Sequence, residues 1–268
     1  RLLSNTAPFH DDPTELARTE FRFRSITWTE TGMGLLTEND RLTRWTRTSL
    51  LSSNTAPRTL WDRSTEDRYA DPGTPATVSS PGGAMIRQTG NSIFLTGAGA
   101  SPGGDQPFLD RLNLRTLDTE RLFRSANDAY EVVAALLSPE SLSVLTRRET
   151  QTEPPNYYVR HLTTSTTQAV TNFPAPAPEL TGIQKKLVTY ERNDGVRLSG
   201  TLYLPSHYEE GQRLPLLMWA YPREFVDPQL AGQISGSDNR FTTVRGASHL
   251  LLRAQSFAIF DGPTKPII

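Results

Sequence analysis

Short runs of alternating hydrophobic and polar residues fill roughly the first 180 positions of the chain, with almost no helical periodicity. Clear examples are 25–29 (SITWT), 112–117 (LNLRTL) and 158–163 (YVRHLT). A period of two is typical of strands that bury one face. Clusters of proline and glycine separate the runs, at 71–73, 80–83 and 101–104. The pattern predicts an all-β region of short strands joined by turns.

The strands also recur in a loose order. Runs at 42–48, 110–116 and 158–164 each open a unit, and apolar runs at 59–61, 121–123 and 168–170 close it. A spacing of roughly 50 to 65 residues without helices is typical of β-propeller blades. We therefore predict an incomplete propeller of about three blades over residues 1–172, fewer than the four or more blades with which propellers close.

The pattern changes near residue 183. A turn sequence at 193–195 (NDG) lies between alternating runs and predicts a β-hairpin. The continuous apolar run 214–220 predicts a strand buried on both faces, 247–255 a short helix, and 257–260 another buried strand. This order is typical of the N-terminal part of an α/β domain over 183–268. The proline-rich segment 173–182 between the two regions predicts an extended linker.

Composition narrows the function classes. With 36% hydrophobic and 21% charged residues and a formal net charge of -1, the chain favours neither nucleic acid nor an anionic membrane as a partner. It has no cysteine, and its four histidines show no metal-ligand spacing, so we predict no metal or cofactor. The apolar run 214–221 is too short to span a membrane, and we expect no signal peptide. The compartment stays undetermined.

Five segments carry a family resemblance: 193–196 (NDGV), 199–205 (SGTLYLP), 214–225 (LPLLMWAYPREF), 239–241 (NRF) and 257–263 (FAIFDGP). With them the chain resembles the prolyl oligopeptidase superfamily of S9-type serine peptidases, in particular the glutamyl endopeptidases of plastids and bacteria. The resemblance is specific over about 180–268 and looser before that. It implies an incomplete propeller followed by the start of an α/β-hydrolase domain, peptides as substrates, and acyl-enzyme hydrolysis after glutamate.

The same resemblance places the catalytic serine, aspartate and histidine after the strand that ends near Asp261, beyond Ile268. The chain alone is therefore expected to be an inactive piece of a longer protein. One element can be carried over: Tyr221 occupies the place of the tyrosine whose hydroxyl helps to form the oxyanion hole. Gly99-Ala100-Ser101-Pro102-Gly103 matches the nucleophile motif G-x-S-x-G, but no helix is predicted after it, so we interpret Ser101 as a loop residue.

Arginines are the candidate substrate-binding residues. An enzyme that cleaves after glutamate must neutralise a carboxylate, and arginine does so with two parallel hydrogen bonds. Arg223 and Arg240 are the candidates, and an ordinary surface ion pair is the alternative for each. We expect His249 to bond a nearby carbonyl and Asp261 to serve a turn. A different class of function also stays open: a non-enzymatic scaffold built from a propeller and part of a hydrolase domain.

Overall fold

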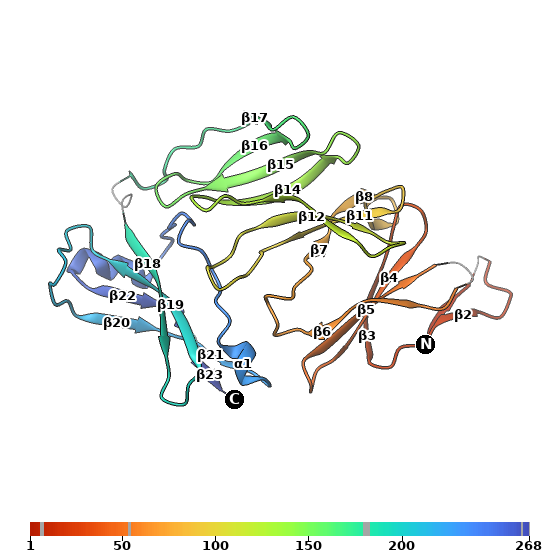
Figure 1. The fold of residues 1–268 in the computed structure, drawn as a ribbon, viewed down its shortest axis with the longest axis horizontal. Helices are drawn as coiled ribbons and strands as arrows, with labels where there is room; N and C mark the ends of the chain where they lie inside the picture. The colour runs from red at the N-terminus through yellow and green to blue at the C-terminus, as the bar shows by residue number, and fades with distance from the viewer. Residues whose placement is uncertain (6–7, 53–54, 179–182, 264, 268) are drawn as a thin grey trace.

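The structure is a computed structural model, and it describes residues 1–5, 8–52, 55–178, 183–263 and 265–267. Its first two thirds are antiparallel sheets that follow one another along an arc (Figure 1). The first large sheet consists of β3 (Arg22–Trp28), β4 (Gly34–Asp40), β5 (Trp45–Leu51) and β6 (Arg58–Ser64). Each strand pairs with the next in the sequence, as predicted for a propeller blade.

Two further sheets repeat this up-and-down order. The second contains β10 (Gln88–Thr89), β11 (Ser92–Gly97), β12 (Phe108–Asn113) and β13 (Thr119–Arg124), with β7 (Thr74–Pro75) also paired to β11. The third contains β14 (Tyr130–Ser138), β15 (Ser143–Glu149), β16 (Asn156–His161) and β17 (Thr166–Ala169). Two short pairs accompany them: β1 (Leu2–Ser4) with β2 (Thr14–Ala17), and β8 (Thr77–Ser80) with β9 (Gly83–Ile86).

The alternation in β11 joins the three sheets into one packed unit. Ile93 and Leu95 point to one side and pack with Leu35 and Leu50 of the first sheet. Phe94, between them, points to the other side and packs with Val144 of the third sheet. Because successive side chains of a strand face opposite ways, a single apolar tripeptide covers both faces of the middle sheet. All three of its residues are at most 2% exposed.

Three predicted strands begin or end at the wrong residue: the run 158–164 ends at His161, and the other two share one cause. The predicted strand 42–48 begins only at Trp45, because Asp40 accepts hydrogen bonds from the Leu42 amide (2.9 Å) and the Thr43 hydroxyl (2.8 Å). The predicted runs 110–116 and 112–117 end at Asn113, whose side chain accepts from the amides of residues 115 and 116. Asp and Asn close turns in this way and stop the strand.

The last third forms a separate mixed sheet in the order β18-β19-β22-β20. The predicted hairpin is present: β18 (Gln184–Glu191) pairs antiparallel with β19 (Arg197–Leu204), and Gly195 in the turn has φ +84°. β20 (Leu216–Trp219) runs parallel to β22 (Ala258–Asp261). A second parallel pair joins β21 (Pro222–Glu224) to β23 (Lys265–Ile267).

The structure corrects one expectation about this part of the chain and bears out two others. The run 214–220 is not buried on both faces: Leu216, Met218 and Trp219 are each more than half exposed. Within the described residues β20 is the edge strand of this sheet, next to β22. The segment 247–255 forms a 3-10 helix, η2 (His249–Gln255), capped by the Ser248 side chain. The buried strand predicted at 257–260 is confirmed by β22, where Ile259 is 0% exposed.

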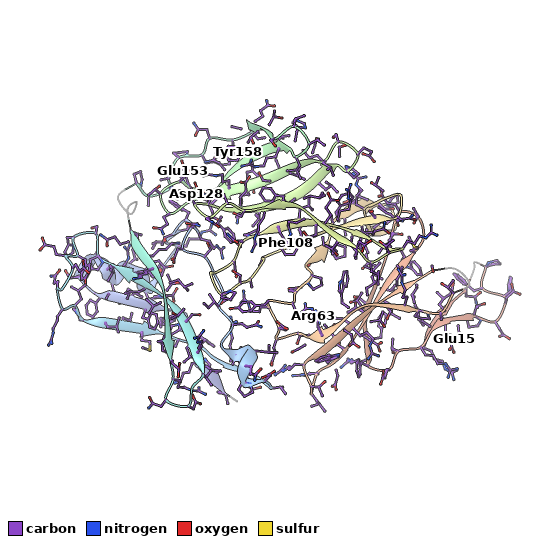
Figure 2. The ribbon with its side chains drawn as sticks, viewed as in Figure 1. Glu15, Arg63, Phe108, Asp128, Glu153 and Tyr158 are labelled. Carbon is purple, nitrogen blue, oxygen red and sulfur yellow. The ribbon has the colours of Figure 1, made fainter. Side chains whose placement is uncertain are left out.

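A strap, residues 225–241, connects β21 back to the three antiparallel sheets. Its only regular element among the described residues is the one-turn helix α1 (Pro228–Ala231), capped by Asp227. In Figure 1 the strap runs upward from α1, between the mixed sheet and the arc of antiparallel sheets. The strap is one of the structural links between the two halves of the chain. Figure 2 shows the side chains of both halves around it.

Candidate functional site

Tyr221 lies immediately after the mixed sheet's edge strand, where β20 passes into β21. The backbone on either side of it is held by parallel pairing: Trp219 is in register with Asp261, and Pro222 with Lys265. The phenol itself is 79% exposed. It therefore projects from the carboxyl end of β20, the end of a parallel strand at which α/β sheets bind their ligands.

Three side chains form a cluster beside this strand end. Nε2 of His249 lies 3.0 Å from Oδ1 of Asp261. The imidazole also stacks on Trp219, with 4.8 Å between ring centroids and 13° between ring planes. The sequence analysis expected a carbonyl partner for His249 and a turn role for Asp261; the partner is instead the Asp261 carboxylate. The cluster could not be predicted from the sequence, because its members come from three elements. Only the parallel register of β20 and β22 brings them together.

The two candidate arginines are not brought together. Arg223 is exposed in β21, and its neighbour Glu224 pairs with Arg44 of the first sheet (3.6 Å). Arg240 lies at the far end of the strap, with its guanidinium 5.0 Å from the ring centroid of Tyr130 in the third sheet. Within the described residues neither arginine takes part in an ion pair. Arg223 is the one placed near Tyr221.

The strap is anchored to all three antiparallel sheets. In the segment that follows the first sheet, between β6 and β7, the Gln233 side chain accepts from the Arg68 amide (2.6 Å) and donates to Asp67 (2.8 Å). At the second, Asp105 exchanges two hydrogen bonds with Gly236. At the third, the Asn239 side chain donates to the carbonyl of residue 127 (2.6 Å) and the amide of residue 241 donates to Glu149 (3.0 Å). The main chain that follows Tyr221 is thus fixed to each sheet in turn.

Buried charges mark this interface. Burial lowers the pKa of Lys185 in β18 from 10.5 to about 8, and the nearby positive charge of Arg240 adds to the effect. The ammonium group of Lys185 donates to the main-chain carbonyl of Arg240. Burial also raises the pKa of Asp105, against the stabilising bond from the Gly236 amide and the nearby Arg68. Both groups lie where the strap meets its neighbours, so they couple the contact between the two halves to pH.

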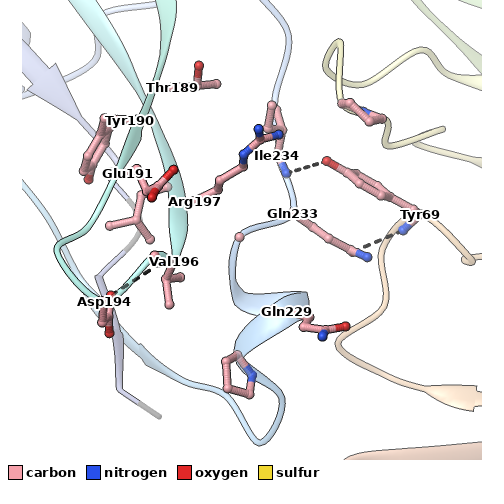
Figure 3. A pocket seen from close by; sticks show the side chains of 15 residues that line it. Tyr69, Thr189, Tyr190, Glu191, Asp194, Val196, Arg197, Gln229, Gln233 and Ile234 are labelled. Atoms are coloured by element: carbon pink, nitrogen blue, oxygen red, sulfur yellow. Dashed lines mark hydrogen bonds between the residues drawn. The ribbon is translucent and has the colours of Figure 1, made fainter.

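A cavity of about 810 Å³ separates the β18–β19 hairpin from the strap. Figure 3 shows Arg197 of the hairpin extending toward Ile234, whose amide is bonded to the phenol oxygen of Tyr69 (2.9 Å). At the hairpin tip, Asp194 binds Arg192, and this bond lowers the pKa of Asp194 to about 2. The hairpin role predicted for Asp194 agrees with this position. Tyr221 does not line the cavity, so the cavity is separate from the end of β20.

Ser101 lies in the loop between β11 and β12, as the sequence analysis predicted. Its hydroxyl donates to the Gly104 carbonyl (2.7 Å) and accepts from the Gly103 amide (3.2 Å), and no helix follows it. His161 on β16 bonds the hydroxyl of Ser143 (2.7 Å), far from the end of β20 in the sequence and in another sheet. The G-x-S-x-G match is therefore a turn that satisfies its own polar groups.

No group of three or more His, Asp or Glu side chains gathers within the described residues in a way that could hold a metal ion. The same part of the chain contains no helix that is long and apolar enough to cross a membrane. Neither finding identifies a ligand for the site at the end of β20.

Comparison with known proteins finds two plant relatives of this chain. The chain is 38% identical over 279 residues to a protein of Arabidopsis thaliana named "Probable glutamyl endopeptidase, chloroplastic", a match that covers 96% of this chain and 29% of that protein. A protein of the same name from Oryza sativa subsp. japonica is 38% identical over 287 residues, covering 99% of this chain and 31% of that protein. The chain is a homologue of the plant glutamyl endopeptidases. It spans about 30% of the length of these relatives.

A solved structure supports the fold of this glutamyl endopeptidase homologue. An AtxE2 isopeptidase variant with astexin3-dC4 bound aligns with a TM-score of 0.50 and 13% identity, over 96% of this chain and 33% of that one. This likeness concerns the fold, and it agrees with the successive antiparallel sheets of the predicted propeller-like region. No family model matches the sequence.

Proposed function

We propose that this chain is a segment of a serine-type endopeptidase, comprising part of its propeller and the start of its α/β-hydrolase domain. The observation that carries the proposal is the 38% identity to chloroplastic glutamyl endopeptidases over 96% of the chain. The division we propose is a partial propeller at 1–172, a linker at 173–182 and the hydrolase segment at 183–268. Residues 179–182 of that linker lie outside the described residues.

The parallel arrangement at the end of β20 supports a hydrolase role for the second half. In the proposed reaction, a serine hydroxyl attacks the peptide carbonyl and negative charge develops on its oxygen. The phenol of Tyr221 donates a hydrogen bond to that oxygen, which lowers the barrier of acyl transfer. Tyr221 is suited to this role because its hydroxyl is exposed and its main chain is fixed by β20 and β21.

Peptides are the proposed substrates, with glutamate before the scissile bond. Arg223 is the proposed partner of the glutamate carboxylate, because it is exposed two residues after Tyr221 and is in none of the ion pairs seen among the described residues. Arg240 is the less suitable of the two candidates, since its guanidinium already lies over Tyr130. The catalytic serine, aspartate and histidine are proposed to belong to the longer protein, which leaves this chain inactive by itself.

A serine-directed fluorophosphonate probe tests the proposal. The 268-residue chain should show no labelling above that of heat-denatured protein, and Ser101→Ala should behave identically. The longer protein that contains this chain should be labelled at one serine and should hydrolyse peptides after glutamate. In that protein, Tyr221→Phe should lower kcat by about 10²- to 10³-fold with little change in KM. Labelling of the chain itself contradicts its expected inactivity. A longer protein that does not react contradicts the peptidase proposal and favours a scaffold.

A further inference from the structure

The cluster of Trp219, His249 and Asp261 holds the strand end that presents Tyr221. Trp219 is the last residue of β20, Asp261 the last of β22, and His249 the first of η2. The main chains of the two strands are joined here as well, because the Gly262 amide donates to the Trp219 carbonyl (2.9 Å). Three elements thus meet at one point, two residues before the proposed oxyanion donor.

The chemistry of the cluster fixes the imidazole in one orientation. A carboxylate can only accept hydrogen bonds, so the N–H of this bond is on Nε2 of His249, and the Asp261 carboxylate accepts it. This bond sets the plane of the ring, and the ring lies nearly parallel to the Trp219 indole. An aspartate that orients a histidine, which in turn orients a third group, is a common arrangement for fixing a side chain in an active site.

Trp219 needs such support. Its side chain is 51% exposed on an edge strand, so packing alone leaves it free to change rotamer. The stacked imidazole covers one face of the indole and removes that freedom. Tyr221 needs support even more, since its phenol is 79% exposed and its position depends on the backbone that precedes it.

We propose that His249, oriented by Asp261, is a positioning residue that fixes Trp219 and, through it, the peptide that presents Tyr221. The inference rests on the proposed function for its catalytic consequence, whereas the positioning itself is a property of this chain. His249 touches neither substrate nor the reacting atoms in this scheme. Its effect on the reaction passes through Tyr221.

The positioning is measured in the 268-residue chain by ¹⁹F NMR after incorporation of 5-fluorotryptophan. The chain has four tryptophans, and Trp219→Phe assigns the resonance of Trp219. His249→Ala should shift this resonance and increase its solvent isotope effect. Asp261→Ala should produce the same shift, although its carboxylate takes no part in the ring stack. Asp261→Asn should stay near wild type, because the amide oxygen still accepts from Nε2.

Hydrogen exchange gives the second readout. The amides of 219–221 and 223–225 should exchange about tenfold faster in His249→Ala and Asp261→Ala than in wild type. His161→Ala is the matched control, since it removes a hydrogen-bonded histidine from the third antiparallel sheet and should leave both signals unchanged. If Asp261→Ala leaves the resonance and the exchange rates at their wild-type values, the positioning role is overturned. Should His249→Ala unfold the chain, His249→Phe keeps a flat ring and reports the loss of the carboxylate bond alone.

Kinetics separate this inference from the proposed function. In the longer protein, His249→Ala should lower kcat with KM unchanged, and it should add no further loss in the Tyr221→Phe background. An equal loss in both backgrounds shows that His249 acts elsewhere and overturns the positioning role, while the proposed function stands. If instead Tyr221→Phe retains full activity, the oxyanion role fails, and the NMR result still decides whether His249 positions this segment.

Discussion

Two hydrogen bonds join Asp105 and Gly236 across the boundary between the two halves of the chain. The Asp105 amide donates to the Gly236 carbonyl (2.7 Å), and the Gly236 amide donates to the Asp105 carboxylate (3.0 Å). Gly236 has φ +96°, a conformation that glycine adopts without steric cost. The strap can therefore turn its main chain toward the loop of the second sheet, and it does so midway between its contacts with the first and third sheets.

Removing this carboxylate should loosen the strap. Asp105→Ala leaves the Gly236 amide without its partner, and we expect a loss of about 1 to 3 kcal/mol in the free energy of unfolding. The measurement is chemical denaturation together with hydrogen exchange at 232–241. Asp118→Ala, at an exposed loop position, is the matched control and should change neither. Unchanged exchange in the strap of Asp105→Ala would show that the other anchors suffice.

Stability should also depend on the protonation of Lys185. Its pKa is lowered from 10.5 to about 8 in the folded chain, so between these values the unfolded chain binds one more proton than the folded one. The free energy of unfolding therefore gains a contribution that rises with pH from about 8 to 10.5. We expect this contribution to be about 2 kcal/mol after allowance for partial solvent screening.

Two variants isolate this contribution from other groups that titrate at high pH. Burial raises the pKa of Tyr130 and Tyr203, so their contributions fall as pH rises and oppose that of Lys185. Unfolding curves of wild type and Lys185→Met, recorded from pH 7 to 10, should converge as the lysine loses its charge. Lys186→Met, at an exposed position on the same strand, serves as the matched control. Parallel curves for wild type and Lys185→Met would contradict the expectation.

The positions of the strands could be predicted from the sequence better than their burial and their long-range contacts. Strict alternation marked the blade-like strands, and the Asp-Gly turn marked the hairpin, because both signals are local. The burial of β20 was predicted wrongly, since an apolar run does not reveal whether other elements cover the two faces of the strand. The strap was not predicted at all: its contacts join residues more than 100 positions apart, as between Gln233 and Arg68.

Only part of the candidate site could be predicted from the sequence. Tyr221 came from the family resemblance, and Arg223 from its charge and its position two residues later. The His249–Asp261 bond could not be predicted from spacing, because it depends on the parallel register that sets Asp261 beside Trp219. Register between distant strands is fixed by tertiary packing, which a single sequence does not encode in any local pattern.

Close packing between β19 and β22 provides a test of the mixed sheet. A Cβ atom on Gly200 would lie 2.7 Å from the ring of Phe260 and 2.9 Å from the Cα of Pro263. Gly200→Ala should therefore destabilise the chain by about 1 to 3 kcal/mol. At Gly82 a Cβ atom would have nothing within 4 Å, so Gly82→Ala is the control and should be neutral or slightly stabilising. Equal stability of the two variants would mean that β19 and β22 do not pack as described.

Selectivity for glutamate should depend more on Arg223 than on Arg240. Arg223 is exposed beside Tyr221, whereas the Arg240 guanidinium lies over Tyr130 at the other end of the strap. A charge-assisted hydrogen bond contributes about 1.5 to 3 kcal/mol, which corresponds to roughly 10- to 100-fold in rate. In the longer protein, Arg223→Ala should reduce the ratio of kcat/KM for glutamate over glutamine substrates by that factor. Arg223→Lys should restore part of it.

Arg240→Ala is the matched comparison in this assay. It should weaken the contact with the third sheet and lower stability while leaving the ratio within about twofold of wild type, because its guanidinium does not lie at the end of β20. If Arg240→Ala abolishes the selectivity and Arg223→Ala preserves it, the carboxylate is bound against the third sheet. The substrate would then extend along the strap, away from Arg223, and the pocket for the glutamate side chain would be formed by both halves of the protein.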